Sequence, residues 1–301
     1  MGIPVDIGTN SAAILAVADR LWSVYPVSPD RSPITLRVMV QSGVKSAAAP
    51  SLLGQEHLMS IIGDAHNFAV CDLAASFGYA RVTEHVALDG EYFLYHFLEA
   101  AIYTMMEARY FCPVHASCIA LDGRAILLCG DSGAGKTSLA YACAKMGWTF
   151  LSGDATCIVR DRAEPSVAGR PFSIRFRSEA RELFPELGGF APQRRANGKL
   201  DIEIDTQELG LSTALESRAV GIVFLNRRRT GASVKKAARV GSFSREEAFE
   251  QCSRAICYGN EDIRVAQKKA LCGFLTLPVA ELTYSGFDEA ESALRRMATG
   301  A

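Results

Sequence analysis

Residues 130–137 bring together, in eight consecutive positions, the residue types that bind a phosphate chain. They read GDSGAGKT and match the pattern GxxxxGK[ST], with Gly130, Gly135, Lys136 and Thr137 at its fixed positions. The glycines let the backbone turn tightly and present N–H groups to phosphate oxygens, and a following helix adds the positive end of its dipole. Lys136 is expected to reach the β- and γ-phosphates, and the Thr137 hydroxyl to ligate Mg²⁺. A nucleoside triphosphate is therefore the expected ligand. The residues expected to contact it are Gly130, Asp131, Ser132, Gly133, Ala134, Gly135, Lys136, Thr137 and Ser138.

The flanking sequence supplies the strand and the helix that this motif requires. Residues 125–129 (AILLC) form an apolar run typical of a buried strand, and residues 138–146 have an alanine-rich helical pattern that Gly147 ends. A second short strand over residues 148–151 leads to Asp154. Because an α/β sheet binds its ligands at the carboxyl ends of its strands, Asp154 is the best-placed carboxylate for handling a metal and an attacking hydroxyl. The alternative for Asp154 is a turn-forming role in the sequence SGD.

A wider stretch, residues 115–154, resembles the catalytic core of the HPr kinase/phosphorylase family and related bacterial serine kinases. In that family a histidine lies on the strand before the loop strand, and here His115, on an expected strand over residues 114–121, precedes Gly130 by fifteen residues as it does there. The family also carries an acidic pair after the loop helix. Asp154 matches the second acid of that pair, whereas Gly153 stands where the first is expected.

The resemblance implies a phosphotransferase that uses ATP and Mg²⁺ to phosphorylate a hydroxyl, usually a serine on a protein or peptide acceptor. It further implies that Thr137 and Asp154 hold the metal and that Asp154, aided by His115, activates the hydroxyl. Residues 171–177 alternate like a strand that points Arg175 and Arg177 the same way. The family has an arginine near the phosphates on such a segment, so Arg175 is the candidate for stabilising transition-state charge. A solvated strand face is the alternative for Arg175.

Gly153 leaves one acid where the family has two. A single carboxylate must then both bind the metal and accept the proton, or His115 must help. Positioning and charge stabilisation carry most of phosphoryl transfer, so one acid is compatible with activity. Two alternatives stay open: an ATP-binding regulator or pseudokinase without phosphotransfer, and a small-molecule kinase that uses the same loop.

Composition excludes several other classes of protein. The chain has 301 residues and 49% apolar content, enough for a large core in one or two domains. Its net charge of −1 argues against nucleic-acid binding through overall electrostatics. Its nine cysteines include no CxxC pair, as in reduced cytosolic proteins, and no apolar stretch is long enough to span a membrane. We expect a cytoplasmic protein without nucleic-acid or membrane partners, and a homo-oligomer is possible.

One region of the chain is strongly basic although the net charge of the whole chain is close to zero. Between residues 217 and 245 the sequence has eight basic residues and no acid. These residues are Arg218, Arg227, Arg228, Arg229, Lys235, Lys236, Arg239 and Arg245. The run is either a solvated loop after a buried strand or a surface that steers an acidic peptide or a nucleotide.

The patterns together predict an α/β fold in which a P-loop-containing mixed sheet is flanked by helices, as the resemblance to the HPr kinase catalytic domain implies. Residues 110–301 are expected to form this catalytic domain, and residues 1–109 an N-terminal α/β region of unknown role. The main elements expected in the first region are strands over residues 34–40, 67–73 and 79–88 and a helix over 90–110. Those expected near the C-terminus are helices over residues 244–257, 262–275 and 288–297 and a strand over 279–284.

Overall fold

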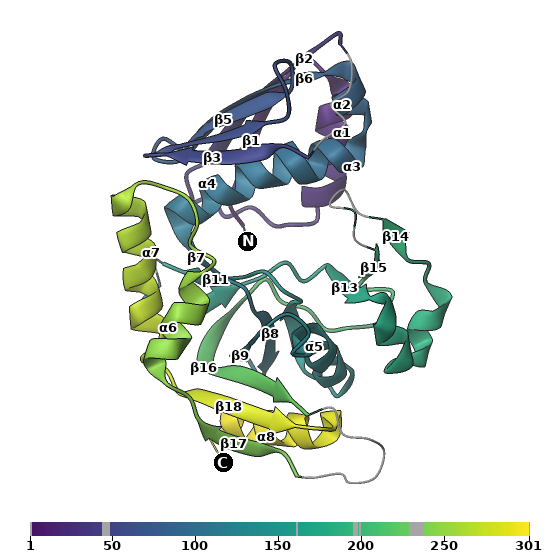
Figure 1. Cartoon of the computed structure of the whole chain (residues 1–301), viewed down its shortest axis with the longest axis vertical. Helices are drawn as coiled ribbons and strands as arrows, with labels where there is room; N and C mark the ends of the chain where they lie inside the picture. Colours follow the sequence, from purple (N-terminus) through teal and green to yellow (C-terminus); the bar gives the residue numbers. More distant parts are fainter. Residues whose placement is uncertain are drawn as a thin grey trace. The chain divides into compact units, whose positions relative to one another are not determined.

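The computed structural model of the chain describes residues 2–43, 49–160, 162–194, 198, 200–228 and 237–300. These residues form a mixed α/β protein of sheets and helices, which confirms the predicted fold class at this level (Figure 1). The chain divides into two compact units. Unit 1 comprises Met1–Phe111, Arg194–Lys199 and Cys257–Gln267, and unit 2 comprises Cys112–Gln193, Leu200–Ile256 and Lys268–Ala301. No helix among the described residues is long and apolar enough to cross a lipid bilayer.

Unit 1 is built on a six-stranded sheet in the order β1-β2-β6-β5-β4-β3. The first three of these strands run parallel to one another, and the others continue from β6 as an antiparallel meander. The strands are β1 (Val5–Thr9), β2 (Ile34–Gln41), β3 (Ser51–Gln55), β4 (Leu58–Ile62), β5 (Phe68–Asp72) and β6 (Phe77–Thr83). The predicted antiparallel pair over residues 67–73 and 79–88 is therefore present, while β1, β3 and β4 were not predicted.

Helices cover one face of this sheet (Figure 1). They are α1 (Ala12–Trp22), α2 (Glu84–Leu88), α3 (Gly90–Phe93), the π-helical η1 (Leu94–Glu99) and α4 (Ala100–Tyr110). The predicted strand over residues 79–88 is wrong in its second half. The chain leaves the sheet at Thr83, because the Thr83 hydroxyl accepts a hydrogen bond from the Val86 amide at 3.4 Å and caps α2. The predicted helix over residues 90–110 is confirmed, with the π-helical turn inside it.

Unit 2 contains a nine-stranded mixed sheet in which β9 lies between β8 and β16. Its main path runs β10-β8-β9-β16-β12-β11-β7, and β18 pairs with both β16 and β17. Strand β16 is parallel to β9 on one side and to β18 on the other. The strands are β7 (Phe111–Val114), β8 (Ser117–Leu121), β9 (Arg124–Cys129), β10 (Thr149–Ser152), β11 (Thr156–Val159), β12 (Ser166–Ala168), β16 (Glu216–Arg227), β17 (Arg239–Ser242) and β18 (Val279–Tyr284).

Hydrophobic side chains pack on both faces of this sheet, and strand β9 contributes to both. Ile126 and Leu128 pack with α5 (Lys136–Lys145) and α8 (Phe287–Thr299), whereas Leu127 and Cys129 pack with α6 (Arg245–Ser253) and the second half of α7 (Glu261–Phe274). A strand that is covered on both faces has a continuous run of apolar residues, so the run AILLC correctly predicted a buried strand. The predicted strand and helix on either side of residues 130–137 are thus present as β9 and α5, and α6, α7, β18 and α8 match the predicted C-terminal elements.

A smaller three-stranded sheet lies beside the amino-terminal part of α5. It has the order β13-β15-β14, with β13 (Ser173–Arg177), β15 (Leu200–Asp205) and β14 (Gln193–Arg194). Two 3₁₀ turns, η2 (Ser178–Glu182) and η3 (Pro185–Gly189), follow β13. Phe176 and Phe184 from this segment stack edge-on against Tyr141 of α5, at centroid distances of 5.1 and 4.8 Å. These contacts hold β13 against the helix that follows the glycine-rich loop.

Candidate functional site

The loop between β9 and α5 has a backbone conformation that favours glycine at three positions, Gly130, Gly133 and Gly135, and neighbouring atoms crowd the first and the last of them. Gly130 and Gly135 adopt φ angles of 136° and 92°, in the left-handed region. A Cβ on Gly130 would lie 3.2 Å from the Leu225 carbonyl oxygen, and one on Gly135 would lie 2.8 Å from the Tyr284 hydroxyl. Neighbouring strands β16 and β18 therefore leave no room for side chains at either end of the loop.

Lys136, the first residue of α5, lies beneath this loop. Its side chain is buried, with the residue only 7% exposed, and the ammonium donates to the Gly130 and Asp131 carbonyl oxygens at 2.8 and 3.2 Å. Burial lowers the pKa of this amine, while the nearby charges of Asp154 and Asp131 partly oppose the shift in pKa. A buried cation that is held mainly by carbonyl oxygens is incompletely compensated, so an anion arriving in the loop would stabilise it.

The amino-terminal end of α5 adds further donors. The first amides of an α-helix have no acceptor within the helix, and its dipole places partial positive charge at this end. Within the loop the Ala134 amide donates to the Asp131 carbonyl at 3.1 Å, which closes the turn. The combination of loop, helix terminus and buried ammonium suits a multiply charged anion.

The Gly153 carbonyl joins this helix to the end of strand β10. It accepts hydrogen bonds from the Thr137 hydroxyl at 2.9 Å and from the Ser117 hydroxyl. A hydroxyl that donates its proton keeps both lone pairs, so Thr137 remains able to ligate a cation. Asp154, the next residue, is exposed at the carboxyl end of β10. The structure thus brings the two residues predicted to bind the metal to the same strand end.

These two oxygen donors fit a magnesium ion that arrives with a nucleotide. Mg²⁺ takes hard oxygen ligands and is commonly held by one or two protein groups together with substrate phosphates and water. Within the part of the chain that the structure describes, no three histidine, cysteine, aspartate or glutamate residues cluster as a self-sufficient metal site. A hydroxyl and one carboxylate beside this loop are oxygen donors of the kind that could hold Mg²⁺ together with substrate phosphates.

Of the two arginines on β13, the structure places Arg177 at the loop. Its guanidinium donates to the Ser132 hydroxyl at 2.7 Å, and its charge helps to lower the pKa of Lys136. Arg175, the residue chosen from the sequence, instead forms an ion pair with Glu203 of β15 at 3.0 Å. Alternation along the strand predicted that both point the same way, but the cross-strand partner that occupies Arg175 is not visible in the local pattern.

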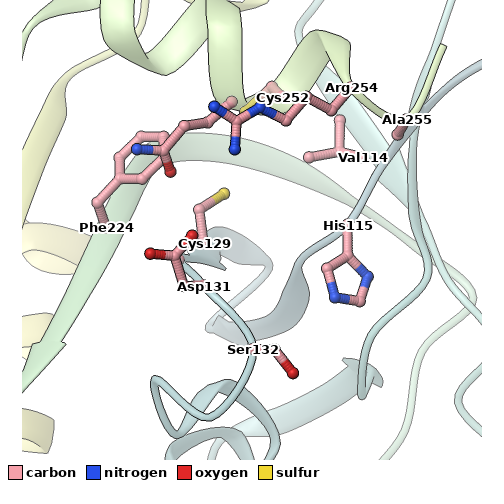
Figure 2. Close-up of a pocket in the computed structure, with 11 residues that line it drawn as sticks. Val114, His115, Cys129, Asp131, Ser132, Phe224, Cys252, Arg254 and Ala255 are labelled. Atoms are coloured by element: carbon pink, nitrogen blue, oxygen red, sulfur yellow. The ribbon is translucent and has the colours of Figure 1, made fainter.

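A pocket of about 250 Å³ opens beside the loop, on the side of α6 (Figure 2). Figure 2 shows the His115 ring on the side of the pocket where Ser132 lies, and the Cys129 thiol directed toward the segment that carries Cys252. A hydrogen bond with Cys252, together with burial, raises the pKa of the Cys129 thiol. The lining residues are Val114, His115, Cys129, Gly130, Asp131, Ser132, Phe224, Gln251, Cys252, Arg254 and Ala255.

His115 occupies a turn and not the strand on which it was predicted. The Ala116 amide donates to the Val114 carbonyl at 2.9 Å, a three-residue turn with His115 at its centre, and β8 begins only at Ser117. The turn leaves the His115 side chain exposed at the pocket wall. Asp154 is not among the lining residues, so the two groups assigned to hydroxyl activation approach the loop from different elements.

The pocket wall also contains residues that the sequence did not single out. Gln251, Cys252 and Arg254 come from α6 and its end, more than a hundred residues after the loop. Arg254 is in contact with Glu250 at 3.3 Å, one helical turn earlier. No local signal marks these positions, because only the packing of α6 on the sheet brings them to the loop.

The basic run does not form one continuous surface over its described residues. Arg218 and Arg227 lie near opposite ends of β16, and an extended strand separates residues nine positions apart by roughly 30 Å. Arg218 lies 3.4 Å from Glu164, and the Arg227 guanidinium is 5.2 Å from the Phe287 ring centroid, close to Gly135. Arg229, Lys235 and Lys236 lie outside the described residues.

Comparison with known proteins finds structural similarity that is distant. No protein-family model matches the chain, and no curated protein matches it by sequence. Among solved structures, the HPr(Ser) kinase/phosphatase from Coxiella burnetii aligns with 62% of this chain and 91% of its own length, at 11% identity and a TM-score of 0.36. A TM-score this low identifies neither the fold family nor the activity of the chain.

Proposed function

We propose that the protein is an ATP-dependent phosphotransferase that phosphorylates a hydroxyl, most directly a serine on a protein or peptide. The observation that carries the proposal is the buried Lys136 ammonium beneath a loop whose terminal glycines are both conformationally required. The resemblance of residues 115–154 to the HPr kinase core supports the same chemistry. Loop amides, the terminus of α5 and Lys136 would hold the phosphates of ATP.

Thr137 and Asp154 would hold Mg²⁺ through their oxygens. When bound, the ion neutralises charge on the β- and γ-phosphates and so lowers the barrier to transfer. Arg177 already contacts the loop through Ser132 and is assigned the charge-stabilising role for which the sequence suggested Arg175. The Gly153 carbonyl fixes the orientation of the Thr137 hydroxyl, which costs no reorganisation when the nucleotide arrives.

The acceptor hydroxyl would enter through the pocket beside the loop. Its oxygen forms a bond to the γ-phosphorus as the bond from that phosphorus to the bridging oxygen breaks, and ADP leaves. Asp154, aided by His115 on the pocket wall, takes the acceptor proton. This division of labour is supported by the positions of the two residues, since Asp154 follows β10 next to Gly153, the partner of Thr137, and His115 lines the pocket.

Incubation with γ-labelled ATP and serine-containing peptides tests this proposal. Asp154→Asn is expected to lower transfer at least a hundredfold, while ATP binding in the absence of Mg²⁺ changes little. A matched control is Asp122→Asn, an exposed aspartate in the turn between β8 and β9, where asparagine tolerates the φ of 48°. The assignment of Asp154 is wrong if Asp154→Asn and Asp122→Asn transfer phosphate equally well.

A second candidate, an ATP-binding regulator or pseudokinase, is favoured by Gly153 at the position of the family's first acid. It predicts saturable ATP binding that Lys136→Ala abolishes, with no transfer to any acceptor. Gly153→Asp separates the two, because a Cβ there would make only ordinary contacts, the nearest being Thr137 Cγ2 at 3.6 Å. Transfer that appears only in Gly153→Asp identifies a degenerate kinase, and transfer already present in the wild type identifies an enzyme that works with one acid.

A small-molecule kinase remains the third reading. The pocket volume of about 250 Å³ is large enough for a small acceptor as well as for a single peptide side chain. Profiling amino acids and sugars alongside peptides distinguishes these substrates.

A further inference from the structure

The six-stranded sheet of unit 1 has one buried face and one open face. Strand alternation places Leu36, Ile61 and Ala80 on the face beneath the helices, each at most 2% exposed. The cross-strand register places the alternate positions together on the opposite face, with Leu53, Ser60, Val70 and Tyr79 in one row. Seven large apolar side chains are exposed on this open face. They are Met39, Leu53, Leu58, Ile62, Val70, Phe77 and Tyr79, and they are 37–57% exposed.

Such a face is unusual for the solvent side of a sheet, where polar residues normally alternate with the buried apolar ones. At roughly 200 Å² for a fully exposed large side chain, these exposures leave about 600 Å² of apolar side-chain surface open. That area is at the upper end of what the largest patch of a monomeric protein exposes. The open face therefore has the character of an interaction surface.

The mixture of charges on this face favours a second copy of the same face as the partner. Arg37 pairs with Asp6 at 2.8 Å, Asp72 lies 3.8 Å from His57, and Arg81 donates to the Gln41 side chain at 2.7 Å. Positive and negative groups thus occur together on this face, among its apolar side chains: Arg37 lies opposite Tyr79, and Asp72 lies between Phe77 and Leu58. A nucleic acid or an acidic membrane would need a single sign of charge, whereas two copies of a locally balanced apolar face do not repel each other.

The area is also sufficient for self-association. Two copies that bury their apolar faces against each other would remove about 1,200 Å² from water, which is the lower end of the range for stable protein interfaces. Twisted sheets pack face to face about 10 Å apart, and a two-fold axis makes one patch complementary to itself. Leu53, Val70 and Tyr79 share the central row of the face. Val70 and Tyr79, on the adjacent inner strands β5 and β6, would lie nearest the middle of this interface, whereas Leu53 lies on the edge strand β3.

We propose that the protein forms a two-fold dimer through the open face of the unit 1 sheet. The inference does not depend on the proposed kinase activity, because it rests on residues of unit 1 alone.

Sedimentation velocity at protein concentrations between about 1 and 100 μM, which covers dissociation constants in the micromolar range, measures the dimer directly. The wild type is expected to shift from one to two times its 32.5 kDa mass across this range. Leu53→Ser together with Val70→Thr is expected to weaken dimerisation at least tenfold. Both positions are exposed, so the fold should persist, and circular dichroism verifies it. Leu88→Ser is the matched control, because Leu88 is 75% exposed at the end of α2 and lies off the sheet.

A second measurement needs no substitution. Hydroxyl-radical labelling of Met39, Phe77 and Tyr79 is expected to fall at least threefold between the low and high concentrations, while labelling of Met146 in unit 2, 37% exposed, stays constant. A wild type that remains monomeric at 100 μM overturns the proposal. So does a dimer whose affinity is the same in the double variant, or one in which the open face is labelled equally at both concentrations.

Discussion

Arg177 and Arg175 lie two residues apart on one strand, and their different partners predict opposite phenotypes. Arg177 contacts the loop through Ser132 at 2.7 Å, whereas Arg175 is paired with Glu203 at 3.0 Å. Replacing Arg177 by alanine removes an exposed guanidinium beside the expected phosphates. A charge-assisted contact of this kind contributes about 1–2 kcal/mol, so the Kd for ATP is expected to rise about 5–30-fold.

Arg175→Ala acts on stability instead. The ion pair is partly shielded, with side-chain exposures of 32% for Arg175 and 23% for Glu203. Losing it costs about 1 kcal/mol at most after solvent screening, which corresponds to a fall in Tm of roughly 2–4 °C for a domain of this size. ATP affinity is expected to stay within a factor of two or so of the wild type.

Isothermal titration with ATP and Mg²⁺, followed by thermal unfolding of the same samples, measures both effects. The two variants control for each other, because each removes the same side chain from the same strand. If Arg175→Ala weakens ATP binding more than Arg177→Ala does, then the contact with Ser132 does not mark the phosphate site. The charge-stabilising role would in that case return to Arg175.

Three further predictions follow from the loop and its surroundings. Lys136→Met removes a buried cation and is expected to raise the Tm of the nucleotide-free protein while abolishing the rise in Tm that ATP produces, as differential scanning fluorimetry would show. Because burial lowers the pKa of Lys136 below its usual 10.5, ATP binding is expected to weaken as the pH rises through the lowered pKa. Between that pKa and 10.5 the unfolded chain binds more protons than the folded one, so the free energy of unfolding without ATP should rise with pH in urea titrations. Gly153→Ala should change stability by less than about 1 kcal/mol, whereas Gly169→Ala, whose Cβ would lie 2.1 Å from the Leu151 carbonyl oxygen, should cost at least about 3 kcal/mol in the same titrations.

The parts of the fold that the sequence predicted well are those encoded by local pattern. Strand β9, helix α5 and strand β10 follow from an apolar run, an alanine-rich period and Gly147, all within 30 residues. Strand β3 was missed because SLLGQ neither alternates nor carries β-branched residues, and all five of its residues are exposed. The end of β6 was misplaced because a threonine cap competes with continued strand pairing.

Only those candidate site residues that are neighbours along the chain could be predicted from the sequence. The loop glycines, Lys136 and Thr137 are recognisable because their roles depend on backbone geometry within one turn. The choice between Arg177 and Arg175 depends on Glu203, which lies 28 residues after Arg175 on another strand. The position of His115 depends on a turn of three residues, and the pocket wall on the packing of α6. Such features arise from tertiary contacts that one sequence does not display.

The buried thiols have a practical consequence. Seven cysteines are buried, while Cys257 and Cys272 are exposed. Burial raises the pKa of Cys71 to about 12, and it raises that of Cys118 as well. Because only the accessible thiolate reacts quickly with alkylating reagents, the buried positions will be modified at the rate at which the surrounding structure opens.

The two units therefore carry their own internal probes of opening. Cys71 reports on unit 1, and Cys129, immediately before Gly130, reports on the loop of unit 2. If the loop binds a nucleotide as proposed, the modification of Cys129 is expected to slow while that of Cys71 stays unchanged. Mass spectrometry of the wild-type protein during alkylation can thus measure, in a single time course, whether a ligand occupies the loop and how readily each unit opens.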